Sequence, residues 1–185
     1  AELKVFKALQ ATLPQDAKIY CQCHFFKTGY DGNKTDGECD MIVLIPNEGI
    51  IFLEIKGGLV GYKAQDKQFT STRRDNNKTF PIKNPVVQAR SAQINIFDLF
   101  KKHSTAHKDN FINCIYAVCF PDTPRPPDPR PFGPDMPLNI FLFQDSLHDI
   151  SKALNEVCRW FRGDKEIYRL GPPIIKAFDR LLVGN

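Results

Sequence analysis

The sequence predicts an α/β fold, in which a mixed β-sheet is flanked by helices on both faces. Apolar, β-branched runs at 41–45, 50–55 and 112–120 indicate strands that are buried in a sheet. Helical patterns precede, separate and follow these runs, and helices in this order cover the faces of a sheet. The 185 residues are enough for one domain with a substantial core.

The first elements follow from hydrophobic periodicity and turn residues. Residues 2–12 show the apolar spacing of a helix, with Glu2 on the same stripe as the apolar side chains. Residues 17–26 alternate and predict a strand, whereas 27–37 are rich in Gly, Asp and Asn and predict a loop. The next two apolar runs flank Pro-Asn-Glu-Gly at 46–49 and therefore predict a β-hairpin.

The later elements follow from capping residues and further apolar runs. Residues 59–63 and 68–73 predict a more polar hairpin. Asn84 is expected to cap a helix that begins at Pro85 and ends near Lys102. Its expected inward residues are Val87, Ile94, Phe97 and Phe100. The remaining expected elements are a buried strand at 112–120, a strand at 139–143, and helices at 146–161 and 173–182.

Three charged residues mark the first hairpin. Asp40 opens its first strand, and Glu54 and Lys56 end its second strand. Residues two apart on a strand share a face, so Glu54 and Lys56 point the same way. Asp40 shares that face if it lies opposite Glu54, which requires an odd-numbered turn such as 46–48. A four-residue turn would place Asp40 on the other face, and the apolar runs leave both arrangements open.

This Asp…Glu-x-Lys pattern is typical of PD-(D/E)xK nucleases. Two carboxylates offer the hard oxygen ligands that Mg²⁺ prefers, and a metal lowers the pKa of water. A cation such as Lys56 can orient that water or stabilise charge on phosphate oxygens. The alternative is a frayed strand end with a surface ion pair, because Glu-x-Lys is common by itself.

Several spaced motifs in one order make the match specific. Glu2 begins the first helix, and Glu38-Cys39-Asp40 leads into a strand. Gly49 precedes the strand that ends in Glu54-Ile55-Lys56-Gly57, and Asn84-Pro85-Val86-Val87-Gln88 opens the later helix. Over residues 2 to about 120 the chain resembles a nuclease-related (NERD) domain of the PD-(D/E)xK superfamily. Cys39 between two acids is unusual, and the Pro-rich segment at 121–137 resembles an insertion.

The resemblance implies a restriction-endonuclease-like fold and a nuclease that hydrolyses phosphodiester bonds with Mg²⁺ or Mn²⁺. DNA is the expected substrate. The alternative is a catalytically inactive relative that binds nucleic acid or a protein partner. The implied metal-binding residues are Asp40, Glu54 and Ile55, and the implied catalytic residues are Asp40, Glu54, Lys56, Glu2 and Gln88.

Two of these residues have ordinary alternatives. Glu2 can be an acid in a first helical turn, where the helix dipole favours it. Gln88 can be an exposed glutamine one turn into its helix. If that helix end points at the site, its amides favour anions and Gln88 could bind phosphate or a metal-associated water.

Charge gives moderate support for a nucleic acid partner. The chain has a net charge of +4, and residues 56–90, the basic stretch, contain eight cations and two acids. Phe69 and Phe80 lie between these cations and could stack on bases. The alternative is a solvated polar hairpin. The expected nucleic-acid-binding residues are Lys63, Lys67, Arg73, Arg74, Lys78, Lys83 and Arg90.

The chain is expected to be one domain, 1–185, cut from a larger protein whose other domains would be partners. Residues 121–137 hold eight of the fourteen prolines and predict a stiff surface loop, where Arg125 and Arg130 could contact a partner. No Gly-x-x-x-x-Gly-Lys-Ser/Thr motif is present, which excludes a P-loop NTPase.

The cysteines and the hydropathy pattern bear on location. Six cysteines lie mostly in apolar runs, which predicts reduced core thiols rather than disulfides or a zinc site. His103 and His107 are expected to be a solvated pair. No apolar run reaches the length of a membrane span, so no membrane partner is expected. The expectation is an intracellular, cytoplasmic protein, with the nucleus as an open alternative.

Overall fold

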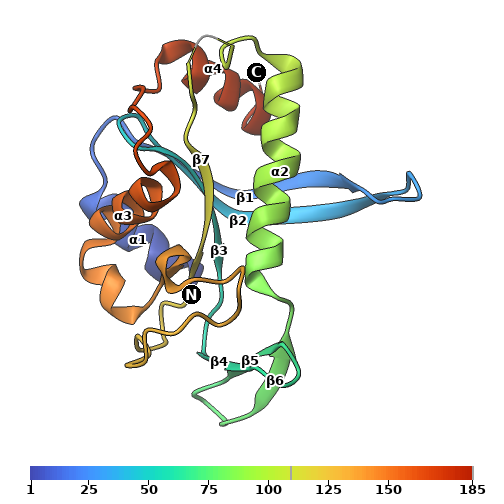
Figure 1. Cartoon of the computed structure of the whole chain (residues 1–185), viewed down its shortest axis with the longest axis vertical. Coiled ribbons are helices and arrows are strands. Elements are labelled where there is room, and N and C mark those ends of the chain that lie inside the picture. Colours follow the sequence, from blue (N-terminus) through green and yellow to red (C-terminus); the bar gives the residue numbers. More distant parts are fainter. Residues whose placement is uncertain (109, 185) are drawn as a thin grey trace.

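A five-stranded mixed sheet forms the centre of the computed structural model, which describes residues 1–108 and 110–184 (Figure 1). The strand order is β1-β2-β3-β7-β8; β1, β2 and β3 are antiparallel, and β7 and β8 run parallel to β3. The expected α/β fold with a mixed sheet is confirmed. The strands are β1 (Lys18–Thr28), β2 (Lys34–Ile45), β3 (Gly49–Ile55), β7 (Cys114–Cys119) and β8 (Phe141–Leu142).

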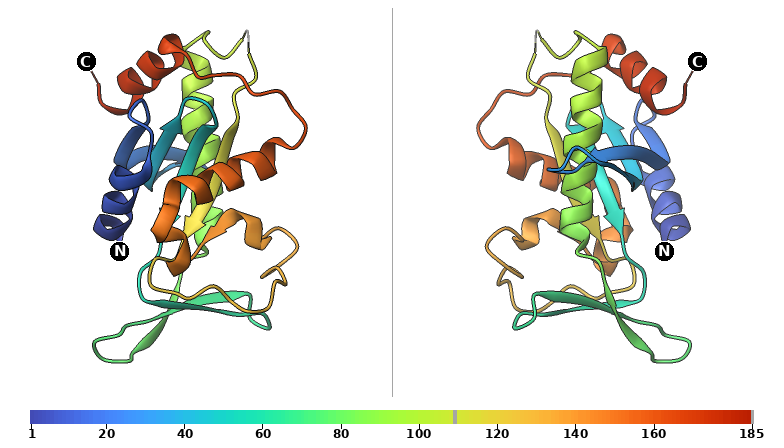
Figure 2. Two further views of the ribbon diagram at one scale, coloured as in Figure 1. Left: turned by 90° about the vertical axis from the view of Figure 1, so that its left-hand side faces the viewer. Right: turned by 90° about the vertical axis from the view of Figure 1, so that its right-hand side faces the viewer.

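Helices cover both faces of this sheet. α1 (Glu2–Thr12) and α3 (Ile150–Arg162) lie on one face, and α2 (Pro85–His103) and α4 (Pro172–Leu182) lie on the other (Figures 1 and 2). All seven residues of β3 are buried, so this strand is the core of the sheet. Its odd-numbered side chains pack toward α1 and α3, and Ile50 and Phe52 pack toward α2.

Helix α2 begins as predicted but buries a different face. Asn84 Oδ1 accepts hydrogen bonds from the main-chain N–H groups of Val86 and Val87, and Pro85 is the first helical residue. The expected inward positions are wrong for Val87 and Ile94, which are 55% and 50% exposed. The buried stripe is Val86, Ala89, Ala92, Ile96 and Phe100, and its two alanines let the helix approach the sheet closely.

A small three-stranded sheet follows the end of β3. β4 (Leu59–Lys63) and β5 (Gln68–Thr72) form the predicted polar hairpin, and β6 (Thr79–Ile82) adds a third strand that was not predicted. This small sheet lies beyond the end of the main sheet at which β3 ends (Figure 1). It therefore places the basic stretch next to the Glu-x-Lys motif.

The Pro-rich segment contributes to the core, so its description as a stiff surface loop is incomplete. The Phe132 ring lies 5.8 Å from that of Phe69 in β5 and 4.9 Å from that of Phe141, centroid to centroid. Met136 is also buried. The segment therefore connects the small sheet to the main sheet through aromatic packing.

Two C-terminal elements are shorter than expected. The strand predicted at 139–143 is a 3₁₀ turn, Leu138–Ile140, followed by the two-residue β8. The helix predicted at 146–161 begins with another 3₁₀ segment, Gln144–Asp149, before α3. Phe141–Leu142 is buried although it pairs over only two residues, and Gln144–Asp149 is mostly polar and exposed, so neither boundary follows from hydropathy alone.

The loop or turn predicted at 27–37 is present but shorter than predicted. β1 and β2 stay paired from Lys18↔Leu44 to Thr28↔Lys34, and only 29–33 connect them. Beyond Met41, β2 no longer pairs with β3, so residues 23–39 form a two-stranded arm that projects past α2 (Figure 1). Turn-forming residues marked the tip correctly, but the main-chain ladder extends through polar positions on both sides of it.

All six cysteines are free in the structure, in line with the expected thiols. Among the described residues, no helix combines the length and the apolar character that crossing a membrane requires.

Candidate active site

The register of the β2–β3 hairpin brings Asp40 opposite Glu54. Ile45 pairs with Gly49 and Met41 with Leu53, so the turn has three residues, 46–48. This is the odd-numbered arrangement that a shared site requires. Gly49 adopts a positive φ of 154°, and a Cβ there would overlap the carbonyl oxygen of Asn113. The turn is therefore fixed by its contact with the segment before β7.

Asp40 ends the main-chain ladder between the two strands. The last paired residues are Met41 and Leu53, and beyond them Asp40 Oδ2 accepts a hydrogen bond of 2.7 Å from the N–H of Ile55. Burial raises the pKa of Asp40, although the Ile55 N–H and the charge of Lys56 act against this. The carboxylate is thus held at the strand end with one oxygen already bound.

Glu54 is the most buried acid of the site, with 2% of the residue exposed. Its Oε1 accepts a hydrogen bond of 2.7 Å from Lys56 Nζ, while Oε2 is buried and has no hydrogen-bond partner among the described residues. Burial, and then the charge of Asp40, raise the pKa of Glu54 to about 7 despite Lys56. A buried carboxylate in this state is costly unless a cation approaches it.

Two more acids act electrostatically on this pair. The charges of Glu2 and Glu38 both raise the pKa of Asp40, and that of Glu38 also raises the pKa of Glu54. Glu38 was absent from the predicted site, although its place two residues before Asp40 on the same strand was the available signal. We refer to these four acids, whose charges interact, as the acid cluster.

The neighbouring main chain explains how Glu2 reaches the cluster. A Cβ on Gly57 would lie 2.9 Å from Cβ of Ala1, so α1 begins directly against the end of β3. The side chain of Ile55 is buried in the core, so only its main-chain carbonyl could bind a metal. The main-chain N–H of Lys56 donates to Cys119 O over 3.0 Å, which fixes the strand where its side chain emerges.

Gln88 lies one turn into α2 and borders a cavity of about 680 Å³. Its Oε1 is buried and has no hydrogen-bond partner among the described residues. Glu38 and Lys83 line the same cavity. The structure therefore brings Gln88 to the edge of the acid cluster through Glu38.

The seven expected nucleic-acid-binding cations divide into two groups. Arg74 donates to the carbonyl oxygen of Asp122, Arg90 pairs with Asp135 at 3.2 Å, and Arg73 lies over the ring of Phe80. These three hold parts of the protein together. The other four are exposed and make no ion pair within the described residues; they are Lys63, Lys67, Lys78 and Lys83.

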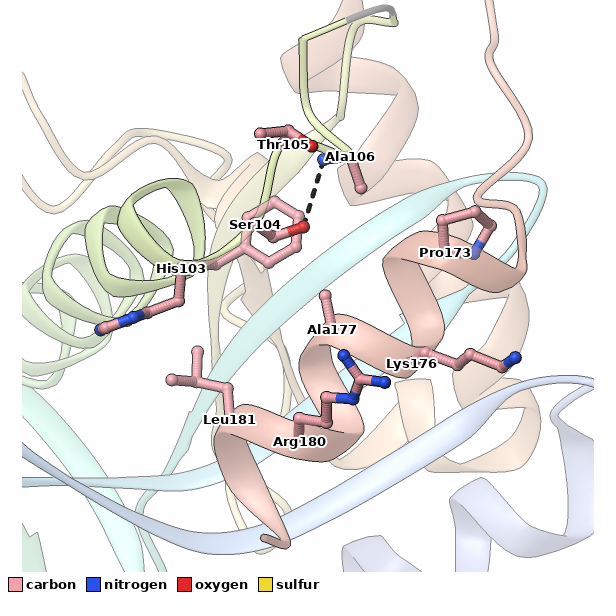
Figure 3. Close-up of a pocket in the computed structure, with 10 residues that line it drawn as sticks. His103, Ser104, Thr105, Ala106, Pro173, Lys176, Ala177, Arg180 and Leu181 are labelled. Carbon is pink, nitrogen blue, oxygen red and sulfur yellow. Dashed lines mark hydrogen bonds between the residues drawn. The ribbon is translucent and has the colours of Figure 1, made fainter. Parts of the chain in front are cut away.

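Another pocket lies away from the acids, between the end of α2 and helix α4 (Figure 3). Its cavity is about 620 Å³, and its lining includes His103, Lys176 and Arg180 but no carboxylate. Across the described residues, no group of three or more His, Cys, Asp or Glu side chains is arranged to hold a metal.

A mixed α/β sheet with paired carboxylates and a lysine at adjacent strand ends defines a restriction-endonuclease-like protein. Comparison with protein families agrees with this class: the model for the nuclease-related domain, NERD, matches residues 1–121. The chain belongs to the NERD family, which is part of the PD-(D/E)xK-like nuclease superfamily. No curated protein and no solved structure matches the chain significantly.

Proposed function

We propose that this protein is a divalent-metal-dependent nuclease that hydrolyses phosphodiester bonds of nucleic acid, with DNA as its expected substrate. The supporting observation is the carboxylate of Glu54, which is buried beside a second carboxylate and whose Oε2 accepts no hydrogen bond from the described residues. A cation shared by Asp40 and Glu54 would compensate both charges. Family membership supports a nuclease-related role at a coarser level.

The donor set suits Mg²⁺ or Mn²⁺. Both cations prefer carboxylate and carbonyl oxygens, which Asp40, Glu54 and the main chain of Ile55 can offer. When bound, such an ion polarises the phosphate and lowers the pKa of the attacking water.

The other residues have distinct proposed roles. Lys56 Nζ, which now neutralises Glu54, would stabilise charge on the phosphate oxygens. Gln88 would orient water or phosphate, and Glu2 would add negative charge on the α1 side. Exposed lysines of the basic stretch would bind the flanking phosphates.

A second candidate is a catalytically inactive domain that binds nucleic acid or a protein partner. One observation favours it: Lys56 and Glu54 already form an ion pair of 2.7 Å, which satisfies both charges in part without any ligand. The two candidates differ in whether the acids have a chemical role.

Cleavage of plasmid and single-stranded DNA, with and without Mg²⁺ or Mn²⁺, distinguishes them. If the protein is a nuclease, cleavage should require the metal and EDTA should abolish it. The Asp40→Asn variant, purified in the same way, should not cleave. Asp66→Asn, in an exposed turn, is the matched control and should cleave normally. Absence of cleavage with retained binding would favour the inactive module, and equal cleavage by Asp40→Asn would reject the assigned site.

A further inference from the structure

The arm formed by residues 23–39 carries aromatic side chains that the core does not use. Phe26 is 64% exposed, and Tyr30 at the tip is fully exposed. A two-stranded hairpin without a third strand is marginally stable in water, so exposed aromatic groups on it add no stability there. Such groups are typical of surfaces that receive a ligand.

One side of the arm forms a groove with helix α2. The cavity of about 680 Å³ described above lies here, and its volume is within the range of about 300–1,000 Å³ found for ligand clefts. Phe25, Phe26 and Leu99 supply its apolar part. We name it the arm groove; its other lining residues are His24, Lys27, Asp36, Gly37, Glu38, Lys83 and Gln88.

Gly37 allows the groove to form on the arm. It pairs across the arm with Phe25, and a Cβ at this position would lie 2.6 Å from the Phe25 ring and 2.8 Å from Lys27 Cε. The Lys27 ammonium in turn lies 5.8 Å from the Phe25 ring centroid. The aromatic ring and the lysine therefore lie over the glycine, where any other residue would displace them.

The arm groove lies beside the proposed active site. Glu38 lines it and is two residues before Asp40 on β2, so the two side chains share one face of the strand. Gln88 lies on the α2 side, and its buried Oε1 accepts no hydrogen bond from the described residues. The groove therefore borders the site along β2.

The chemistry of the groove selects its occupant. Aromatic faces stack on unpaired bases of any sequence, and the free Gln88 oxygen can accept a hydrogen bond from a base N–H or NH₂ group. Lys27 and Lys83 can neutralise flanking phosphates, whereas Asp36 and Glu38 repel them, so the phosphates would follow the lysine side. These features suit an unpaired base, whose faces and hydrogen-bonding edge are accessible, rather than a base that is stacked and paired in a duplex.

We propose that the arm groove binds an unpaired nucleotide beside the cleaved phosphodiester, so that the protein acts preferentially on single-stranded or frayed nucleic acid. This inference depends on the proposed nuclease function, because it names the substrate of the same site. Phe26 is then a substrate-binding residue, with its ring against a base.

The test is metal-free binding measured by fluorescence anisotropy, with a labelled oligothymidylate and a duplex of the same length. Phe26→Ala should weaken single-strand binding about tenfold or more and change duplex binding less than about twofold. Phe26→Trp should restore single-strand binding. Trp160→Ala removes another exposed aromatic residue, from α3, and should change neither.

Equal affinity of Phe26→Ala and the parent for oligothymidylate would overturn the proposal, as would equal losses for the two probes. A dimer of the parent that Phe26→Ala converts to a monomer, seen by light scattering, would instead identify the arm as a self-association surface. The assay contains no metal and scores no cleavage. The binding assay therefore tests the arm groove independently of the cleavage assay, which tests the nuclease function. Either proposal can be rejected while the other is retained.

Discussion

The two ends of β3 each carry an acid with little access to water, and the two acids differ in the charges around them. Glu48, in the turn before β3, lies 2.9 Å from Arg159 and 3.6 Å from Arg162, so two guanidinium groups offset its charge. Glu54, at the other end, has one lysine and a second carboxylate beside it. In both acids Oε2 accepts no hydrogen bond from the described residues, so the difference lies in the neighbouring charges. The first arrangement stabilises the fold, whereas the second keeps a charge that a ligand can compensate.

Replacing the two acids should give the largest contrast. Glu54→Gln should reduce metal-dependent cleavage by about 10³-fold, since it removes a carboxylate ligand and leaves the fold intact. Glu48→Gln should leave the rate nearly unchanged but lower the free energy of unfolding by about 2–3 kcal/mol, because Arg162 loses its buried partner. Plasmid cleavage and urea unfolding of both variants test this prediction. The same loss of cleavage or of stability in both variants would show that the two acids do not have different roles.

Lys56 and Lys101 offer a second contrast, because both lysines form ion pairs with nearby acids. Lys56→Ala should slow cleavage about 10²-fold and leave Mn²⁺ affinity largely intact, by analogy with the loss of an oxyanion donor. Lys101→Ala breaks an exposed pair with Asp98 of 2.9 Å at the opposite end of the molecule and should be silent. Single-turnover rates and Mn²⁺ titrations provide the readout. A parallel loss of metal affinity in Lys56→Ala would make this lysine a structural partner of the acids.

The pH dependence of stability should report Glu54 directly. Its folded pKa of about 7 lies above the ordinary value of 4.5, so the folded protein retains a proton that the unfolded chain releases. Stability should therefore fall as the pH rises from about 4.5 to 7, by roughly 3 kcal/mol from this group, and then level off. Glu54→Gln should flatten this part of the profile in metal-free urea titrations. An unchanged slope in the variant would assign the effect to another group.

The elements near the two acids show how far sequence alone could reach. Apolar runs and a turn located β2 and β3, and the position of Asp40 and Glu54 required a three-residue turn, which the structure has. The same reasoning did not define the inward face of α2, because Ala89 and Ala92 on that face add little to a hydrophobic pattern although they permit close packing. The sequence did not predict the arm, because its strands are held by main-chain hydrogen bonds and its polar side chains give no strand pattern.

Substitution of cations should distinguish the basic stretch from the pocket between α2 and α4 by its effect on nucleic acid binding. Lys63, Lys67 and Lys78 changed together to Glu should flatten the salt dependence of binding, by roughly 0.7–0.9 in the slope of log affinity against log salt for each lost phosphate contact. Lys176 and Arg180 changed to Glu, beside the distant pocket, are the control and should leave the slope unchanged. Anisotropy titrations across salt concentrations decide the matter, and equal slopes for both sets would make the basic stretch only a solvated face.

The smallest effect concerns the thiols. All six should react in denatured, non-reduced protein, whereas in the folded protein Cys21 should react first because it alone is exposed. Burial raises the pKa of Cys158 to about 12 and that of Cys39 well above its usual value. Both thiols should therefore react slowly in the folded protein. Colorimetric thiol titration measures both states. A count near zero after denaturation would reveal disulfides and an oxidising compartment.

The aromatic packing of the Pro-rich segment has a consequence for where this domain can be shortened. The family match ends at residue 121, yet Phe132 and Phe141, which follow it, complete the packing around Phe69 and Phe120 within the match. A fragment truncated at 121 would leave those two rings in water and should aggregate. A shortened form of this chain should therefore keep the downstream proline segment and β8 to remain folded.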